Sequence, residues 1–157
     1  MRYSTKRLIV YCLYLVVWPF GLTSRLAHRR LGSELPFDFS AKLLSLIPGK
    51  IGQYVRAAFY KMTLTESHYD LMVGFGSFFS HPTARAGRHV GLGSFTIVGT
   101  AHIGDNVMIA SRASVMSGKT QHGSPLYGSV RSHELKLEAV TIGEGCWIGE
   151  GAIVGAG

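Results

Sequence analysis

Two histidines lie in a polar segment between two apolar runs. Residues 116–139 read MSGKTQHGSPLYGSVRSHELKLEA and include His122, His133 and Glu134. An imidazole has an ordinary pKa of about 6.5, so it can take a proton from a hydroxyl group near neutral pH. Glu134 could orient either ring, although its spacing does not require that role. A surface histidine without a role is the simpler alternative for His122, and a structural or acceptor-contacting role is favoured for His133.

The residues on both sides of this segment repeat with a period of six. One ladder of aliphatic residues is Ile97, Ile103, Ile109, Val115, Ile142, Ile148 and Val154. A second ladder, four residues behind it, is Ala101, Val107, Ala113, Cys146 and Ala152. A period of six fits neither an α-helix, which repeats every 3.6 residues, nor a plain strand, which repeats every two. It predicts stacked coils of short strands with aliphatic side chains pointing inward, rather than glycine-rich antiparallel hairpins.

The ladder stops between Val115 and Val140. We therefore expect an inserted loop at 117–139, because interruptions of a repeat emerge as loops, and such loops carry function more often than the scaffold does. Trp147 directly precedes the inward-pointing Ile148, so its indole should face outward. An exposed indole is unfavourable unless a ligand or a neighbouring subunit covers it.

Two runs of the chain resemble a known family. The sequences IVGTAHIGDNVMIASRASV (97–115) and VTIGEGCWIGEGAIVGAG (140–157) are similar to the hexapeptide-repeat acyltransferases. The resemblance covers roughly residues 73–157. It implies an all-β solenoid, namely a left-handed parallel β-helix with three hexapeptides per coil, assembled as a homotrimer. The stretch LIPGKIGQYVRAAFYKMTL (46–64) also resembles the leader that precedes this fold in acyltransferases of polysaccharide pathways.

The resemblance also implies an activity, the transfer of acetyl from acetyl-CoA to a sugar hydroxyl. This reaction needs a base for the hydroxyl proton and a donor to the tetrahedral oxyanion, and no metal cofactor is expected. By the resemblance, His122 is the general base, because it opens the loop after the coil ending ASVMSG. It is followed by Gly123, where sugar acetyltransferases of this family often have proline, which leaves the acceptor class open. The resemblance places four residues along the acyl-CoA groove between subunits: Trp147, Gly149, Gly151 and Ala152.

Positive charge is concentrated in the N-terminal part of the chain. Residues 1–61 hold 10 of the 16 Lys and Arg against two acidic residues, a net charge of +8, whereas residues 62–157 carry a net charge of −1. A basic region of this kind indicates either nucleic acid or an anionic membrane. Residues 8–22, LIVYCLYLVVWPFGL, contain no charge. Because nucleic-acid-binding arms lack so apolar a centre, we expect a membrane and no nucleic acid.

The apolar run is short for a complete membrane span. Fifteen helical residues reach about 22 Å, less than the ~30 Å hydrocarbon core, and Pro19 would kink the helix. Basic residues on both flanks suggest that both ends stay on the cytoplasmic side. We therefore expect a cytoplasmic protein that attaches to the inner face of the membrane peripherally or through a re-entrant segment. A cleaved signal peptide is the alternative, although Thr23, Ser24 and Arg25 do not form the usual cleavage site.

A second helix is expected after Pro48. One of its faces is apolar, with Ile51, Tyr54, Val55, Ala58, Phe59 and Met62. Lys50, Arg56 and Lys61 lie off this stripe, as in a helix that rests on anionic lipid. The stripe could equally pack on the first coil as its cap, since stacked repeats need capping elements.

The expected organisation has two parts. Residues 1–62 form a membrane-associated helical region, and residues 63–157 form a β-helix acyltransferase domain with the inserted loop. Glycine is concentrated in the second part, which holds 16 of the 20 glycines. The repeat stops in mid-rhythm at Gly157, before the C-terminal coils that form much of the coenzyme A site in the family. Either the domain is truncated there, or the trimer covers that end.

Two alternatives to the acyltransferase remain. A metal hydratase similar to the γ-class carbonic anhydrases needs three histidines that converge on zinc between subunits. Its candidates are His81, His89, His102 and His122, but no pair has the spacing of those enzymes. A non-catalytic β-helix scaffold at the membrane is the other alternative, and the abrupt C-terminus favours it.

Overall fold

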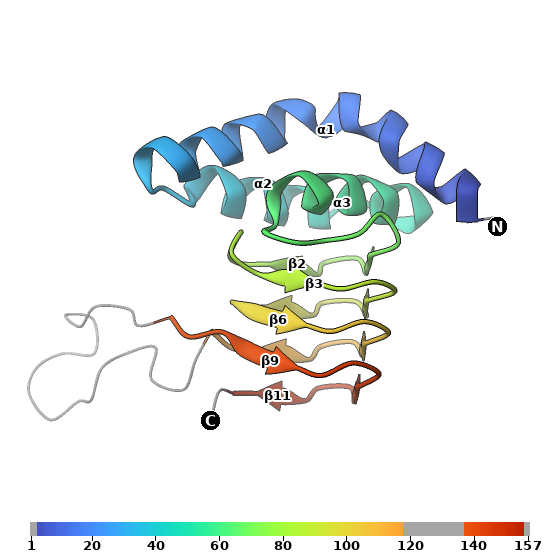
Figure 1. Cartoon of the computed structure of the whole chain (residues 1–157). Coiled ribbons are helices and arrows are strands. Elements are labelled where there is room, and N and C mark those ends of the chain that lie inside the picture. Colours follow the sequence, from blue (N-terminus) through green and yellow to red (C-terminus); the bar gives the residue numbers. More distant parts are fainter. Residues whose placement is uncertain (1–2, 118–136, 156–157) are drawn as a thin grey trace, which may run out of the picture.

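The computed structural model describes residues 3–117 and 137–155. Three helices come first, α1 (Tyr3–Leu31), α2 (Leu35–Ser45) and α3 (Gly49–Thr63). Short strands follow: β1 (Met72–Val73), β2 (Phe78–Phe79), β3 (Arg85–Ala86), β4 (Gly91–Leu92), β5 (Ile97–Val98), β6 (Ala101–Ile103), β7 (Met108–Ile109), β8 (Ser114–Val115), β9 (Val140–Ile142), β10 (Trp147–Ile148) and β11 (Ile153–Val154). Figure 1 shows the helices gathered at one end of the stacked strands, with α1 outermost.

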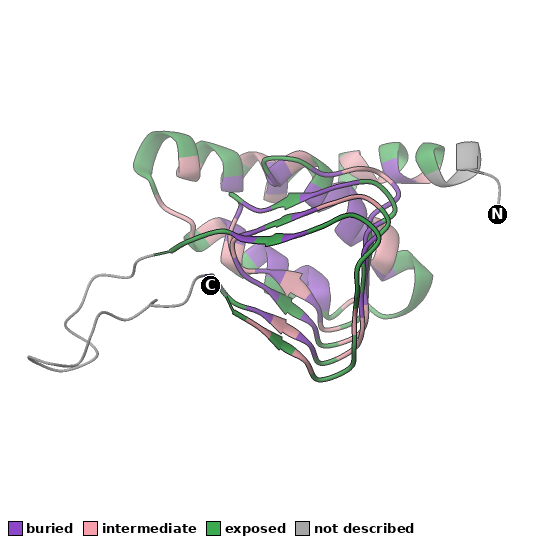
Figure 2. Cartoon of the chain, turned by 60° about the horizontal axis from the view of Figure 1, so that its bottom comes forward, coloured by how far each residue is buried: buried purple, intermediate pink, exposed green. Residues whose placement is uncertain are grey.

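The strands pair in three parallel sheets. Their orders are β1-β4-β7-β10, β11-β8-β5-β2 and β3-β6-β9, so consecutive strands belong to different sheets. Figure 2 shows that the strands follow a triangular outline. Val73, Leu92 and Ile109 illustrate the inward row of one sheet, because they are in register with one another and buried.

The prediction of an all-β solenoid, a left-handed parallel β-helix, is wrong. The protein is mixed α/β: three helices precede the strands, and the described strands belong to three separate sheets rather than to one closed solenoid. The six-residue ladder misled the prediction because it reports only the local spacing of the strands. It contains no information on residues 3–63, whose apolar side chains join the same hydrophobic core as the strands. The helices are therefore an integral layer of the fold.

The prediction that Ile97 points into the interior is wrong. Ile103 and Val115 are buried as predicted, but Ile97 is 42% exposed and Val98 is buried in its place. β5 consists of two adjacent aliphatic residues, and a slip of one residue exchanges the inner and outer faces of a strand. The inward residues Val98 and Ile103 are one position closer together than the repeat of six requires.

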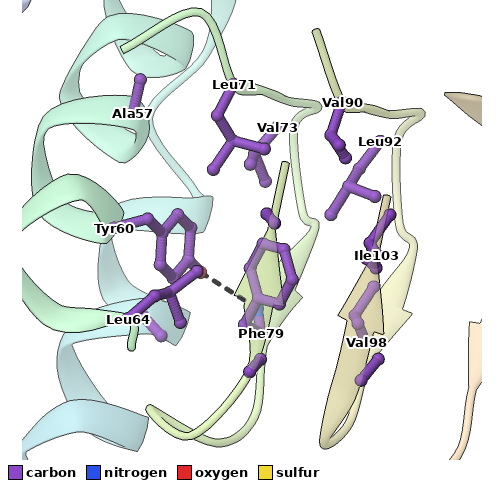
Figure 3. Close-up of a cluster of buried hydrophobic side chains, with 14 of the residues drawn as sticks. Ala57, Tyr60, Leu64, Leu71, Val73, Phe79, Val90, Leu92, Val98 and Ile103 are labelled. Atoms are coloured by element: carbon purple, nitrogen blue, oxygen red, sulfur yellow. Dashed lines mark hydrogen bonds between the residues drawn. The ribbon is translucent and has the colours of Figure 1, made fainter. Parts of the chain in front are cut away.

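Helix α3 packs between α1 and the first strands. Its apolar residues Val55, Ala58 and Phe59 are buried in the protein. Tyr60 is also fully buried, and its hydroxyl accepts a hydrogen bond from the Phe79 amide at 3.1 Å, as Figure 3 shows. Burial raises the pKa of Tyr60. The packing favours the alternative in which this helix covers the first coil, since most of its apolar stripe contacts protein; Ile51, at 71% exposure, is the exception.

Arg56 lies inside the fold, although the sequence placed it on the polar side of α3. It is 1% exposed. Its Nε donates a hydrogen bond to the Val73 carbonyl (2.9 Å), and its Nη1 donates to the carbonyls of Leu44 (3.0 Å) and Ile47 (2.8 Å). Desolvation lowers the pKa of the guanidinium. Carbonyl oxygens at the end of a helix carry partial negative charge, so this buried cation joins the end of α2 to α3 and β1.

Candidate functional site

The predicted base lies outside the described residues. His122 belongs to the segment 118–136, as do His133 and Glu134, so nothing is stated of their positions. The flanks of the segment are described. The Glu138 amide donates to the Ser117 carbonyl at 2.8 Å, which joins the two flanks at the corner between the sheets that contain β8 and β9.

Trp147 faces outward, as predicted. It is 80% exposed, whereas the next residue, Ile148, is half-buried and packs against the core. The register of the sheet aligns Trp147 with Met108, Gly91 and Met72 on neighbouring strands. An indole and two thioethers therefore form one outward row along the sheet β1-β4-β7-β10.

A groove of about 350 Å³ follows this row. Its lining includes Gln53, Met72, Gly91, Met108, Ser111, Trp147 and Glu150. Gly91 helps to keep the groove open, because a Cβ atom there would lie 2.5 Å from the Met108 sulfur. Methionine side chains are flexible and polarisable, so the wall can adapt to an apolar chain or an aromatic ring. Glu150 on the rim is held by an ion pair with Arg112.

The other predicted donor-binding residues lie in the turn after β10. Gly151 has a φ of 70°, a conformation that favours glycine, and its amide donates to the Ser111 carbonyl at 3.1 Å. A Cβ atom at Gly149 or Gly151 would meet no atom within 4 Å, so the outer side of this turn is open. Ala152 is half-buried at the end of the turn. Of the four predicted donor-binding residues, Trp147 lines the groove, whereas Gly149, Gly151 and Ala152 do not.

The flanks of the inserted segment do not border this groove. They lie at the corner between the sheets of β8 and β9, whereas Trp147 lies on the remaining sheet. Within one chain, the two ends at which the inserted segment joins the strands therefore lie away from the groove. The loop itself or a second copy of the chain would have to supply the histidine.

The described histidines do not extend the groove. His81 Nδ1 lies 2.7 Å from a Glu34 oxygen, and His89 Nε2 lies 3.3 Å from the buried carboxylate of Asp70. His102 faces outward on β6. Within residues 3–117 and 137–155, no group of three or more His, Cys, Asp or Glu side chains is placed to hold a metal ion. The described residues therefore provide no zinc site for the hydratase alternative.

Sequence reasoning missed several residues of the groove. Met108 precedes the inward Ile109 as Trp147 precedes Ile148, so the same pattern could have identified it. Gln53 carried no such signal, because it reaches the groove from α3, which lies outside the repeat. The pair of His81 and Glu34 also had no local signal, since 47 positions separate the two residues.

The outer side of α1 exposes large apolar residues. Leu15 is 84% exposed, and Leu8, Val16 and Trp18 are also exposed. Among the described residues, one helical segment, Arg7–Leu31, is long and apolar enough to cross a membrane, and 22% of its most apolar window is buried in the protein. Figure 1 shows α1 curving along the other helices, and Pro19 lies within it. Membrane attachment of residues 8–22 remains a prediction.

No family model matches this chain, and no curated protein or solved structure matches it. The resemblance to hexapeptide-repeat acyltransferases is carried by the runs 97–115 and 140–157, together with the leader-like stretch 46–64. The candidate site therefore depends on its residues and their geometry.

Proposed function

We propose that the chain is an acyl-CoA-dependent O-acyltransferase that transfers acetyl from acetyl-CoA to a sugar hydroxyl of a polysaccharide or lipid-linked precursor. His122 is the general base. It takes the proton of the acceptor hydroxyl as the oxygen attacks the thioester carbonyl. The tetrahedral intermediate then expels the thiolate of coenzyme A, which accepts the proton from the imidazolium. Acetyl-CoA is a co-substrate, and the proposed reaction uses no metal.

The outward indole of Trp147 beside an open groove is the observation that carries this proposal. A large apolar side chain with 80% exposure is unfavourable on a free surface. The pantetheine arm or the adenine ring of the donor would cover it, and Met72 and Met108 would adapt around that ligand. Small residues at Gly149 and Gly151 would let the donor approach the backbone closely.

A polar group in the groove could orient the donor. Ser111 lines the groove, and its Oγ accepts a hydrogen bond from the Ser94 amide at 3.1 Å. Because this contact uses an acceptor site of the hydroxyl, the hydroxyl hydrogen can be donated to a ligand. An amide oxygen of the pantetheine arm would be a suitable acceptor.

We also propose that the chain assembles as a homotrimer with the active site between copies. The exposed residues of the three sheets differ. Two sheets carry exposed apolar residues, namely Met72, Met108 and Trp147 on one and Ile97 and Ile153 on the other. The third carries Arg85, His102 and Thr141. Two apolar sheets and one polar sheet support an assembly in which the apolar sheets of neighbouring copies face each other, with the open groove beside Trp147 between them. Such contact would also let the loop of one copy reach the groove of the next.

The proposed location is the inner face of the cytoplasmic membrane, with peripheral or re-entrant attachment through α1. The exposed apolar residues of α1 and the basic residues on both flanks of 8–22 support it. A membrane location would give the enzyme access to an acceptor that is linked to lipid.

The test is a thiol-release assay with acetyl-CoA and a panel of sugar acceptors. We expect turnover, and we expect His122→Ala to lower kcat by about 10²–10⁴-fold, the contribution of general base catalysis. His102→Ala is the matched control, because it removes an exposed histidine from the polar sheet. No turnover with any acceptor in a folded protein would favour a non-catalytic scaffold. Stoichiometric zinc in the pure protein would favour the hydratase.

The donor site has its own test. Trp147→Ala should raise KM for acetyl-CoA and leave kcat nearly unchanged, because the indole is proposed to bind the donor and not to react. Trp18→Ala is the control, since this exposed tryptophan lies on α1. Equal kinetic effects of the two substitutions would contradict the assignment of the groove.

A further inference from the structure

A separate cavity lies near the C-terminal end of α1. Its volume is about 310 Å³, and residues of α1, α2 and the end of α3 surround it together with Leu64, Thr65 and Pro82. The residues from α1 are Ser24, Arg25, His28 and Arg29, which a helix places on one side because they lie one turn apart in pairs. The cavity shares no lining residue with the Trp147 groove.

The two arginines of this cavity have no acidic partner among the described residues. Both Arg25 and Arg29 are exposed, and no hydrogen bond or ion pair joins either guanidinium to another described side chain. The nearby carboxylate of Glu34 already lies 2.7 Å from His81. Arg112, far along the chain, is the one arginine in the described part with an ion pair.

His28 adds an unsatisfied polar atom. Its Nδ1 is buried and lacks a hydrogen-bond partner among the described residues, and the nearest Glu34 oxygen lies 3.8 Å away, too far for a hydrogen bond. Buried polar atoms normally have a partner, either from the protein or from a bound molecule. The hydroxyls of Thr65 and Ser24 already donate to the carbonyls of Pro82 and Phe20. Because these hydroxyl hydrogens are already used, the donors that Ser24, Arg25 and Arg29 leave for a ligand in the cavity are the two guanidiniums.

The helix dipole gives a simpler explanation for part of this charge. Basic residues in the last turn of a helix are stabilised by the partial negative charge of its C-terminus, and the last turn of α1 contains His28, Arg29 and Arg30. Arg30 fits this explanation fully, because it does not line the cavity. The explanation does not cover Arg25, which lies earlier in α1, or the absence of a carboxylate opposite the two lining guanidiniums.

We propose that this cavity is a binding site for a phosphate group. Phosphate supplies negative charge and several acceptor oxygens, and the planar guanidinium matches its geometry in a bidentate contact. The phosphate can belong to the headgroup of an anionic lipid or to a small soluble molecule. The exposed apolar residues Leu15 and Trp18 of the same helix place the lipid source within reach. The site is independent of acyl transfer, and its test does not use activity.

The experiment measures phosphate binding by the full 157-residue chain and by two variants. Inorganic pyrophosphate is titrated by calorimetry, and flotation compares phosphatidylglycerol vesicles with phosphatidylcholine vesicles. In Arg25→Gln/Arg29→Gln we expect affinity for the bound probe to fall about tenfold or more, as the loss of charged hydrogen bonds predicts. Arg30→Gln removes one positive charge from the same turn as Arg29 without touching the cavity, so its affinity should change less than about twofold, well below the square root of a tenfold loss shared between two charges.

The calorimetric titration and the vesicle flotation together identify the source of the phosphate. Loss of binding to phosphatidylglycerol alone assigns a lipid headgroup, and loss of pyrophosphate binding assigns a soluble phosphate; either result supports the site. Equal losses in Arg30→Gln and in the double variant would show general charge attraction and overturn it, as would no effect on either probe. If the double variant does not fold, Arg25→Lys/Arg29→Lys keeps the charge and removes the bidentate contact. That variant should still bind more weakly than the native chain.

Discussion

Replacing Arg56 with methionine would test how the helices are joined to the strands. The native guanidinium donates to four backbone carbonyls, those of Val73, Leu44, Ser45 and Ile47. Methionine fills part of the same buried space but has no donor. The four carbonyl oxygens would lose this partner, and the end of α2 would lose its link to α3 and β1.

Two opposing effects set the size of the loss. A hydrogen bond from a charged donor contributes about 1.5–3 kcal/mol, and a buried acceptor left without a partner costs about 1–3 kcal/mol. Burial of the guanidinium itself is unfavourable, as its lowered pKa indicates, and methionine removes that cost. We therefore expect Arg56→Met to lower the free energy of unfolding by about 2–4 kcal/mol, a large fraction of the stability of a typical domain.

Urea unfolding followed by circular dichroism measures this loss. For a slope of about 1–3 kcal/mol per molar urea, the midpoint should fall by about 1–2 M. Lys61→Met is the matched control, because exposed Lys61 lies on the same helix and donates to one carbonyl, that of Ser67, at 2.8 Å. The control should lose at most about 1 kcal/mol. An unchanged or higher midpoint for Arg56→Met would refute the role assigned to the buried cation.

Three further changes probe the core, the groove and the outer helix. Burial raises the pKa of Tyr60 above its ordinary value of 10.0. Above about pH 10 the unfolded tyrosine ionises and the folded one does not, so the free energy of unfolding should fall as pH rises. In Tyr60→Phe, the urea midpoint should fall less steeply between about pH 9 and 11 than in the native chain. Gly91→Leu places a side chain against Met108 and should weaken acetyl-CoA binding about tenfold by calorimetry, since it fills the groove. Leu15→Glu places a charge on the outer side of α1, so it should reduce flotation with anionic vesicles and leave the circular dichroism spectrum unchanged.

For each of these three substitutions, one outcome would contradict the prediction. An equally steep pH dependence in Tyr60→Phe would mean that other groups control alkaline unfolding. Unchanged acetyl-CoA affinity in Gly91→Leu would place the donor elsewhere. Unchanged flotation of Leu15→Glu would show that this side of α1 does not contact lipid.

The sequence predicted the strands of the repeat better than the fold that contains them. Aliphatic residues that fill a narrow interior recur at a regular spacing in the sequence, which is why Ile103, Ile109 and Val115 were placed inside correctly. Ile97 was placed wrongly, because two adjacent aliphatic residues are compatible with either face. The fold class was wrong for a different reason: burial of α3 between α1 and the strands depends on contacts between distant segments, which a local pattern does not encode.

The candidate site shows the same division. The outward direction of Trp147 followed from its neighbour Ile148, so one residue of the groove could be identified in advance. Its alignment with Gly91 and Met108 depends on how many residues each coil contains, and the coils vary in length. The buried environment of Arg56 could not be predicted, because α3 has protein on two sides, whereas a surface helix would leave that residue in solvent.

The most direct test of the proposed donor site uses the two tryptophans of the chain, Trp18 and Trp147. In Trp18→Phe the fluorescence comes from Trp147 alone, and titration with acetyl-CoA should quench or shift it in a saturable manner as the donor covers the indole. Trp147→Phe retains only Trp18 and should show no saturable change. Saturable binding of acetyl-CoA by calorimetry without any change in Trp147 fluorescence would contradict the assignment of this groove to the acyl donor.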